Sequence, residues 1–248
     1  MSINLNSCDI GSLYRKYVPF DVRHRLYVLR HIEQFKQLRY KDMYPSNLGK
    51  HSLRRSDSLK CIFIHIPKAA GTSISKSLFK DLTDHHTAFA YQIIFGKRDF
   101  NSYYKFAFVR NPWARLFSAF HYLKSGGWGW YEKQRAQDAF GRYDAFNDFV
   151  ISWLNRETLN TFVHFWPQSR FVSDVRGRLC VNEIFYFENI EEDFAKLCNK
   201  LKIKSTLQRV NVTNAKHDYR ANYTPDAIKK VAELYRKDVE MFKYNFET

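Results

Sequence analysis

The chain has 248 residues, a formal net charge of +15 at pH 7, and 45% hydrophobic residues. This length and apolar content are enough for one large domain with a buried core, so the composition excludes a disordered chain. No run of about 18 apolar residues exists, which argues against a transmembrane helix. Residues 1–11 are polar and lack the apolar centre of a signal peptide, so we expect a soluble, cytoplasmic protein.

The cysteines and the charge narrow the classes of ligand and partner. The cysteines lie far apart and form no Cys-x-x-Cys pair, so we expect no zinc site and no redox motif. A positive charge of this size attracts nucleic acid, anionic lipid or acidic substrates, and composition alone leaves these three open.

The N-terminal region reads as an extension of the main domain. Residues 19–40 predict a helix with apolar residues on one side and basic residues among them. Such a helix packs on its own domain or lies on a membrane surface, so peripheral membrane contact stays open. Residues 45–57 are polar, contain Ser and Gly, and predict a connector. We therefore divide the chain into an extension with its connector, 1–58, and a main domain, 59–248.

The strongest motif consists of a predicted strand, a turn of small residues and a helix. The apolar run at 61–66 predicts a buried strand, which Pro67 ends because proline has no N–H for a sheet. The helix is expected to begin at Thr72 and Ser73, with their hydroxyl groups as its cap, and to continue to Leu82. Backbone N–H groups at such a helix start bind anions, and the helix dipole favours negative charge there.

The position of the lysine separates this loop from a Walker A loop. Lys68 precedes Gly71, whereas the Walker A lysine follows the second glycine of its motif. We therefore expect a phosphate-binding loop of another type. An ordinary turn between a strand and a helix, with an unrelated lysine, is the alternative.

The rest of the chain alternates strands with helices. Strands are predicted at 104–109 and 181–187, a turn at 166–170, and the segment 125–142 has no clear pattern. Helices are predicted to follow three N-terminal caps, Asn111, Asp144 and Asn189, and the last helix is predicted to start near Thr224 and Pro225. This alternation predicts an α/β fold, with a central parallel sheet flanked by helices and ligands at the carboxyl ends of its strands.

A second anion motif follows the strand at 104–109. Arg110 lies at the end of that strand, where a guanidinium gives a charged, forked contact to a phosphate. Ser118 lies two helical turns further on and adds a hydroxyl group. Arg115 either joins this site or pairs with a carboxylate. For Arg110 itself, a salt bridge at the strand end is the alternative to phosphate binding.

Together the two motifs resemble those of a known enzyme family. Residues 67–73, Pro-Lys-x-x-Gly-Thr-Ser, are similar to the 5′-phosphosulfate loop of sulfotransferases that use 3′-phosphoadenosine 5′-phosphosulfate (PAPS). Residues 110–118, Arg-Asn-Pro-x-x-Arg-x-x-Ser, are similar to their 3′-phosphate motif. The strings at 184–189 and 223–225 extend the resemblance, to the carbohydrate-type and bacterial branch, over 62–246. It implies a P-loop-like three-layer fold, PAPS as co-substrate and no metal.

The resemblance also implies roles for particular residues. Lys68 would stabilise the leaving phosphate oxygen, and would hold the 5′-phosphosulfate together with the amides of Ala69, Ala70, Gly71, Thr72 and Ser73. Arg110 and Ser118 would bind the 3′-phosphate. Phe187 would lie near the adenine, and the residues that would close over the nucleotide are Lys216 and Arg220.

The acceptor hydroxyl needs a base, for which His85 and His86 are the candidates. The segment 85–88, His-His-Thr-Ala, resembles a His-x-Thr-Ala segment of bacterial family members. A neutral imidazole with a pKa near ~6.5 is suited to this task. Two surface histidines in a loop are the alternative, in which case Glu132 and Asp138 are the next candidates.

A carbohydrate or glycolipid acceptor is implied, and the positive charge favours an acidic one. Trp128, Trp130 and Trp166 are candidate platforms for sugar rings, with ordinary packing as the alternative. Two other classes compete: a P-loop kinase or nucleotide hydrolase, and a basic module that binds nucleic acid or another polyanion. The first would need a Walker-type lysine and magnesium ligands, which the sequence does not offer. The second leaves the paired anion motifs unexplained, so we expect no nucleic-acid partner.

Overall fold

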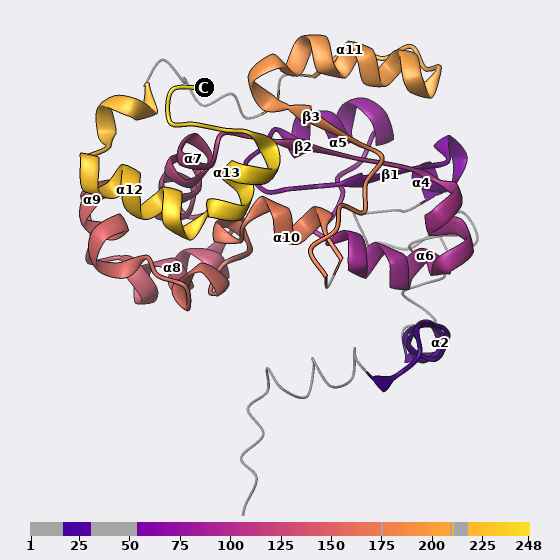
Figure 1. Ribbon diagram of the computed structural model, residues 1–248, viewed down its shortest axis with the longest axis horizontal. Helices are drawn as coiled ribbons and strands as arrows, with labels where there is room; N and C mark the ends of the chain where they lie inside the picture. The colour runs from indigo at the N-terminus through magenta and orange to yellow at the C-terminus, as the bar shows by residue number, and fades with distance from the viewer. Residues whose placement is uncertain (1–16, 31–53, 175, 209, 211–217) are drawn as a thin grey trace, which may run out of the picture.

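The central element of the fold is a parallel sheet of three strands. The computed structural model describes residues 17–30, 54–174, 176–208, 210 and 218–248. The strands are β1 (Cys61–Ile64), β2 (Tyr104–Val109) and β3 (Glu183–Tyr186). They stand in the order β1-β2-β3, and both neighbouring pairs run parallel (Figure 1).

β1 and β2 form where apolar residues are buried on both faces of the sheet. In β1, Cys61 and Phe63 pack on one face, while Ile62 and Ile64 pack on the other. Because successive side chains of a strand point to opposite faces, a strand covered on both sides reads as a continuous apolar run. β1 ends at Ile64, earlier than the predicted end at residue 66.

Helices cover both faces of the sheet. One face carries α5 (Gly71–Phe79) and α11 (Ile190–Leu201), and the opposite face carries α6 (Ala88–Ser102) and α10 (Gln168–Val172) (Figure 1). The predicted three-layer α/β fold is therefore confirmed.

The chain between and after these elements is mostly helical. The other described α-helices are α2 (Phe20–Arg30), α4 (Arg54–Leu59), α7 (Pro112–Lys124), α8 (Trp130–Phe140), α9 (Phe146–Asp148), α12 (Pro225–Leu234) and α13 (Arg236–Phe242). A π-helix and several 3-10 helices complete them: η2 (Phe149–Trp153), η3 (Thr158–Asn160), η4 (Val163–Phe165), η5 (Phe187–Asn189) and η6 (Tyr219–Asn222).

The predicted cap at Asn111 is confirmed, and so is the predicted start of the last helix near Thr224 and Pro225. The Asn111 side chain accepts the N–H groups of Trp113 and Ala114 at the start of α7. The Thr224 side chain accepts the N–H of Ala227 at the start of α12. In both helices proline follows the cap at the first helical position, where its missing N–H costs nothing.

The other two predicted caps are wrong. Asp144 forms an ion pair with Lys124 at 3.0 Å instead, and α9 begins after Ala145. Asn189 does stand at the N-cap position of α11, but within the described residues its side chain accepts no helix N–H. Asp193 accepts the N–H of Tyr186 at 2.8 Å and thereby ties α11 to the end of β3.

Three helices lie where the sequence predicts none. α4 begins at Arg54 and so corrects the predicted connector at 45–57. α6 contains a kink at Gly96, whose φ of 77° interrupts the helical spacing of its apolar residues. α8 is largely polar and buries Ala136 and Phe140. In addition, α10 starts inside the predicted turn at 166–170, and the last predicted helix divides into α12 and α13.

The N-terminal helix is confirmed over its described part, α2; residues 31–40 of the prediction lie outside the described residues. α2 packs against α6. In this contact the Arg23 guanidinium lies 5.3 Å from the centroid of the Phe89 ring. His24 Nδ1 donates to the carbonyl oxygen of Ile93 at 2.5 Å. No helix in the described ranges is long and apolar enough to cross a membrane.

A buried arginine joins the loop after β1 to the segment before α10. Arg115 is fully buried in α7, and its Nη1 donates to the carbonyl oxygens of His164 at 3.1 Å and Pro67 at 3.4 Å. Its Nη2 donates to the carbonyl oxygen of Trp166. The predicted pairing of Arg115 with a carboxylate is therefore wrong for the described residues, because its hydrogen bonds go to backbone carbonyl groups.

We predict that Arg115→Met lowers the free energy of unfolding by roughly 3 kcal/mol or more, because three buried carbonyl groups lose their donor. The control is Arg178→Met, which removes an exposed ion pair to Asp174 and should cost no more than about 1 kcal/mol. Urea unfolding of the two variants measures both values. Equal, small losses would contradict the structural role of Arg115.

Candidate active site

The loop after β1 turns through two residues in the left-handed conformation. Lys68 and Ala70 have φ values of 66° and 60°, which L-residues with a Cβ rarely adopt. Ala70 is the N-cap of α5, and the first bond of the helix runs from Ile74 N–H to the carbonyl of Ala70. The N–H groups of residues 71–73 therefore belong to the first turn, which has no earlier carbonyls to bond and is suited to an anion.

The predicted hydroxyl cap of α5 is wrong. Ser73 Oγ donates to the carbonyl oxygen of Val210 at 3.2 Å and accepts the Val210 N–H at 3.1 Å. The hydroxyl group of Ser73 thus braces a distant segment against α5. Thr72 is half-buried in the first turn, and α5 ends at Phe79, before Leu82.

Residue 71 is glycine because the His65 side chain occupies the space that a Cβ would need. A Cβ on Gly71 would overlap the imidazole of His65, which is buried directly after β1. His65 Nδ1 donates to the carbonyl oxygen of Thr83 at 2.7 Å, and this bond fixes the ring against the loop. Close approach, rather than a left-handed backbone, explains this glycine.

Arg110 connects the two anion motifs directly. Its Nη1 donates to the carbonyl oxygen of Lys68 at 3.3 Å, and its guanidinium lies 4.3 Å from the centroid of the Phe187 ring. Gln168 holds the strand end, because its side chain bonds both the N–H and the carbonyl of Arg110. Burial lowers the pKa of Arg110, and Glu188 opposes this. Its Nε is buried without a hydrogen-bond partner among the described residues.

The ammonium group of Lys68 lies over an aromatic ring. Its Nζ is 4.0 Å from the centroid of the Tyr122 ring in α7, a cation–π contact. Burial and the nearby charge of Arg110 lower the pKa of Lys68 to about 8, and Glu132 acts in the opposite direction. Lys68 is therefore mostly charged at pH 7, with a proton that it loses more readily than an exposed lysine does.

His85 lies beside this loop, as the sequence predicts for a base. Its Nδ1 is 3.0 Å from the carbonyl oxygen of His65, and the two rings are 4.2 Å apart. A carbonyl oxygen only accepts hydrogen bonds, so Nδ1 must carry the proton of the neutral ring. The lone pair is consequently on Nε2, the tautomer that a general base needs.

His164 and Glu132 complete the cluster around Lys68. His164 is buried in η4, and its ring lies 6.0 Å from that of His85 and 5.1 Å from that of Tyr122. Glu132 Oε1 approaches His164 Nδ1 to 3.3 Å without hydrogen-bond geometry, since that nitrogen has no hydrogen-bond partner among the described residues. Burial and the nearby His85 lower the pKa of His164 to about 3. It is therefore neutral near pH 7, and the contact with Glu132 is not an ion pair.

Among the remaining predicted site residues, His86 points away from the cluster. Its Nε2 lies 3.7 Å from a carboxylate oxygen of Asp84, and its ring packs on Tyr91. Ser118 is half-buried on α7, and Ala69 is buried in the loop. Lys216 lies outside the described residues.

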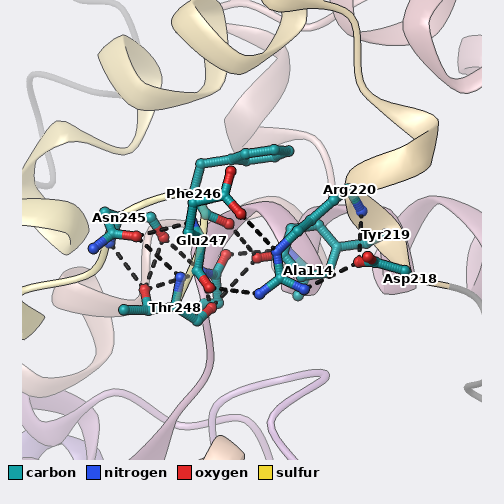
Figure 2. A network of polar contacts seen from close by, with 9 residues as sticks. Ala114, Asp218, Tyr219, Arg220, Asn245, Phe246, Glu247 and Thr248 are labelled. Carbon is teal, nitrogen blue, oxygen red and sulfur yellow. Dashed lines mark hydrogen bonds and ion pairs between the residues drawn. The ribbon is translucent and has the colours of Figure 1, made fainter.

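Arg220 is engaged by the C-terminal segment. Its Nη2 donates to the carbonyl oxygen of Glu247 at 2.6 Å, and its Nε lies 3.4 Å from the carboxylate of the same residue. Its Nη1 donates to Asp218 at 3.1 Å (Figure 2). Contact between Arg220 and a nucleotide would require these bonds to be exchanged.

Side chains bring positive charge to the carboxyl ends of β1 and β2, chiefly those of Lys68 and Arg110. Among the described residues, no group of three or more His, Cys, Asp or Glu residues is arranged to hold a metal ion.

Comparison with known proteins identifies the family. The model of the sulfotransferase family matches residues 51–245. The chain belongs to the sulfotransferase family. It is also 34% identical, over 127 residues, to an uncharacterized protein of Archaeoglobus fulgidus, in a match that covers 50% of this chain and 89% of the other. No solved structure matches. Family membership implies PAPS as the sulfuryl donor of this sulfotransferase.

Sequence reasoning missed two residues of the cluster, Tyr122 and His164, and gave a third, Glu132, a different role. Tyr122 reads as one more half-buried residue of the helix from Asn111, and His164 stands in a segment without a predicted element. Glu132 is named only as a substitute base. The available signal for Glu132 was its place at the third position of a helix after a glycine-rich turn, where an acid favours helix formation.

We predict that Gly71→Ala lowers the free energy of unfolding by roughly 1–3 kcal/mol, because the added methyl group meets the His65 ring. In a His65→Ala background the same change should cost much less, since the ring is gone. A double-mutant cycle by urea unfolding measures this difference. The same cost in both backgrounds would contradict the explanation.

Proposed function

We propose that this sulfotransferase moves a sulfuryl group from PAPS to a hydroxyl group of a carbohydrate or glycolipid. The observation that supports it most is the hydrogen bond from Arg110 to the carbonyl of Lys68, which joins the two anion motifs at one edge of the sheet. Ligands of parallel α/β sheets bind at this edge.

The residues present fit the two anionic ends of PAPS. The first turn of α5 and Lys68 offer N–H groups and an ammonium group to a phosphosulfate. Arg110 offers a guanidinium with a buried Nε that lacks a partner among the described residues, stacked on an aromatic ring. Ser118 would add a hydroxyl group to the 3′-phosphate, and Phe187 would lie near the adenine.

PAPS, when bound, supplies an activated sulfuryl group, whose bond to a phosphate oxygen breaks as the bond to the acceptor oxygen forms. Lys68 would stabilise the phosphate oxygen that gains charge in this displacement. His85 would take the proton of the acceptor hydroxyl at Nε2, the nitrogen that carries the lone pair. Positioning and electrostatics thus supply the rate enhancement.

An exposed aromatic loop supports a saccharide acceptor. Trp128, Trp130 and Tyr131 are 69%, 77% and 67% exposed around the start of α8. Exposed aromatic faces of this kind stack on the apolar faces of sugar rings. Trp166 does not belong to this platform, because the Arg170 guanidinium covers its ring at 3.7 Å.

We also assign the excess positive charge of the protein a role in binding the acceptor. A net charge of +15 exceeds what one nucleotide requires and favours an acidic saccharide. A P-loop kinase or hydrolase would need a lysine after the second glycine of the loop, whereas Lys68 precedes Gly71. A nucleic-acid-binding module would leave the paired anion motifs without a purpose, and we propose no nucleic-acid partner. A glycolipid acceptor would bring the protein to a membrane surface peripherally.

We predict that adenosine 3′,5′-bisphosphate (PAP) binds in the presence of a metal chelator, and that Arg110→Ala weakens this binding by roughly 1.5–3 kcal/mol through the loss of a charge-assisted contact. Lys68→Ala should chiefly lower turnover, because its charge matters most at the leaving oxygen. Calorimetry with PAP and turnover of labelled PAPS against a glycan panel measure these effects. Unchanged PAP affinity in a folded Arg110→Ala protein would assign that residue a structural role.

We predict that His85→Ala lowers turnover by about 10²–10⁴-fold with PAP affinity unchanged, because a base acts on the acceptor and not on the donor. His86→Ala is the matched neighbour, and its pairing with Asp84 predicts near-normal turnover. Single-turnover kinetics of the two variants check this. Normal turnover in His85→Ala would exclude that residue as the base.

A further inference from the structure

Two exposed arginines are attached to one short segment that precedes the buried His164. Arg135 of α8 donates from Nη2 to the carbonyl oxygen of Thr161 at 2.9 Å. Arg170 of α10 donates from Nη1 to the side-chain oxygen of Asn160 at 2.7 Å. Because Asn160 and Thr161 are consecutive residues, two different helices bring their cations to the same part of the surface. We call Arg135 and Arg170 the arginine pair.

Aromatic rings support both guanidinium groups. The guanidinium carbon of Arg135 lies 4.9 Å from the centroid of the Phe162 ring and 5.7 Å from that of the Tyr131 ring. That of Arg170 lies 3.7 Å from the centroid of the Trp166 ring. A stacked arginine presents its donors in a defined direction, and it loses less conformational freedom on binding than a fully solvated side chain does. The arginine pair is therefore prepared to receive a ligand.

The charges of the arginine pair favour an anionic ligand. Like charges that are attached to neighbouring residues repel each other, and no carboxylate among the described residues lies within ion-pair distance of Arg135 to offset this. The bond to Thr161 uses a single N–H of a guanidinium that carries several. An oxyanion bound here would reduce the repulsion and accept charge-assisted hydrogen bonds.

Printed contacts connect the arginine pair to the candidate base. The ring of His85 lies 6.0 Å from that of His164, and His164 Nδ1 is 3.3 Å from the carboxylate of Glu132. Glu132 follows Tyr131 in α8, and the 67% exposed Tyr131 ring contacts Arg135. A continuous path thus runs from the candidate base, past the exposed aromatic loop, to the arginine pair.

We propose that the arginine pair is an acceptor subsite, which binds carboxylate or sulfate groups on the sugar units beside the one that receives the sulfuryl group. This inference rests on the proposed function, because it takes a saccharide as the acceptor. It goes beyond it by assigning the acceptor's negative charge to two particular side chains among the many cations of this chain.

Two other roles for the arginine pair make different predictions. Guanidinium groups that cover aromatic rings and bond a loop contribute to packing, and their removal then changes stability without changing acceptor affinity. Stacked arginines also bind single-stranded nucleic acid through its phosphates and bases. The experiment therefore compares acidic saccharides with neutral saccharides and with DNA.

The experiment is calorimetric titration of the full chain, saturated with PAP, with hexasaccharides of hyaluronan, alginate and polygalacturonate and with their carboxyl-reduced forms. Sulfated and unsulfated maltohexaose form a further pair, which distinguishes sulfate groups from carboxylate groups. A short single-stranded DNA tests binding of nucleic acid. PAP affinity is measured first and separately, so that the donor site and the acceptor subsite are judged independently.

The variants are Arg135→Gln and Arg170→Gln. The control is Arg178→Gln, which removes the same charge from an exposed arginine that lies 2.8 Å from Asp174 in the segment before β3. We expect the wild type to prefer at least one acidic probe to its neutral form, and each variant of the pair to reduce this preference by roughly three- to tenfold. The control should keep the preference, and thermal unfolding verifies that each variant is folded.

Salt provides a second measurement. Binding of the acidic probe to the wild type should weaken as salt is added, because salt screens the charges of both partners. The dependence on salt should be less steep in the two variants of the pair, since each has lost one of the contacting charges. A dependence that is as steep in these variants as in the wild type would contradict the subsite.

The inference would be overturned by a wild type without preference for any acidic probe, by an unchanged preference in both variants of the pair, or by an equal loss in the control. DNA binding tighter than that of every saccharide, and weakened by the same variants, would overturn it in favour of nucleic acid. PAP binding by the wild type would leave the donor side of the proposed function standing in each case. Absence of PAP binding would overturn the proposed function and this inference with it.

Discussion

The buried guanidinium of Arg115 is the constraint on which the site depends. It has no ionised partner within ion-pair distance among the described residues. Its Nη1 and Nη2 donate to carbonyl groups of Pro67, His164 and Trp166, while its buried Nε has no hydrogen-bond partner among these residues. The three carbonyls belong to segments far apart in the sequence. One charged group therefore sets the distance between the loop after β1 and the segment that carries His164, and the hydrogen bonds of its two terminal nitrogens offset part of the cost of its burial.

A second group of buried hydrogen bonds holds the start of α10, which follows the segment that Arg115 holds. Asp238, fully buried in α13, accepts the N–H groups of Gln168 and Ser169 at the start of α10. Gln168 in turn bonds both backbone groups of Arg110. Through Gln168, α13 thereby holds the backbone of Arg110 at the end of β2. Residues that look like ordinary core positions in the sequence therefore position the candidate anion site.

Local sequence predicts the parts of this protein that depend on neighbours in the chain. The strands, the loop with Lys68, the strand-end Arg110 and the cap at Asn111 all belong to contiguous patterns, as does the string that contains His85. The positions of Glu132 and His164 depend on tertiary packing, and nothing near them in sequence indicates a shared site. The cap at Asp144 failed for the same reason: its carboxylate pairs with Lys124, which is distant in sequence, and not with the start of a helix.

The bond between His85 and the backbone of His65 restricts how a proton leaves the site. A carbonyl oxygen, not a ring nitrogen, faces Nδ1 of His85, so the two imidazoles form no relay through this link. With His85 as the base, the proton gained at Nε2 has to depart from Nε2. The base would then be regenerated only after the sulfated product had moved aside, which couples the recovery of the catalyst to the clearing of its acceptor side.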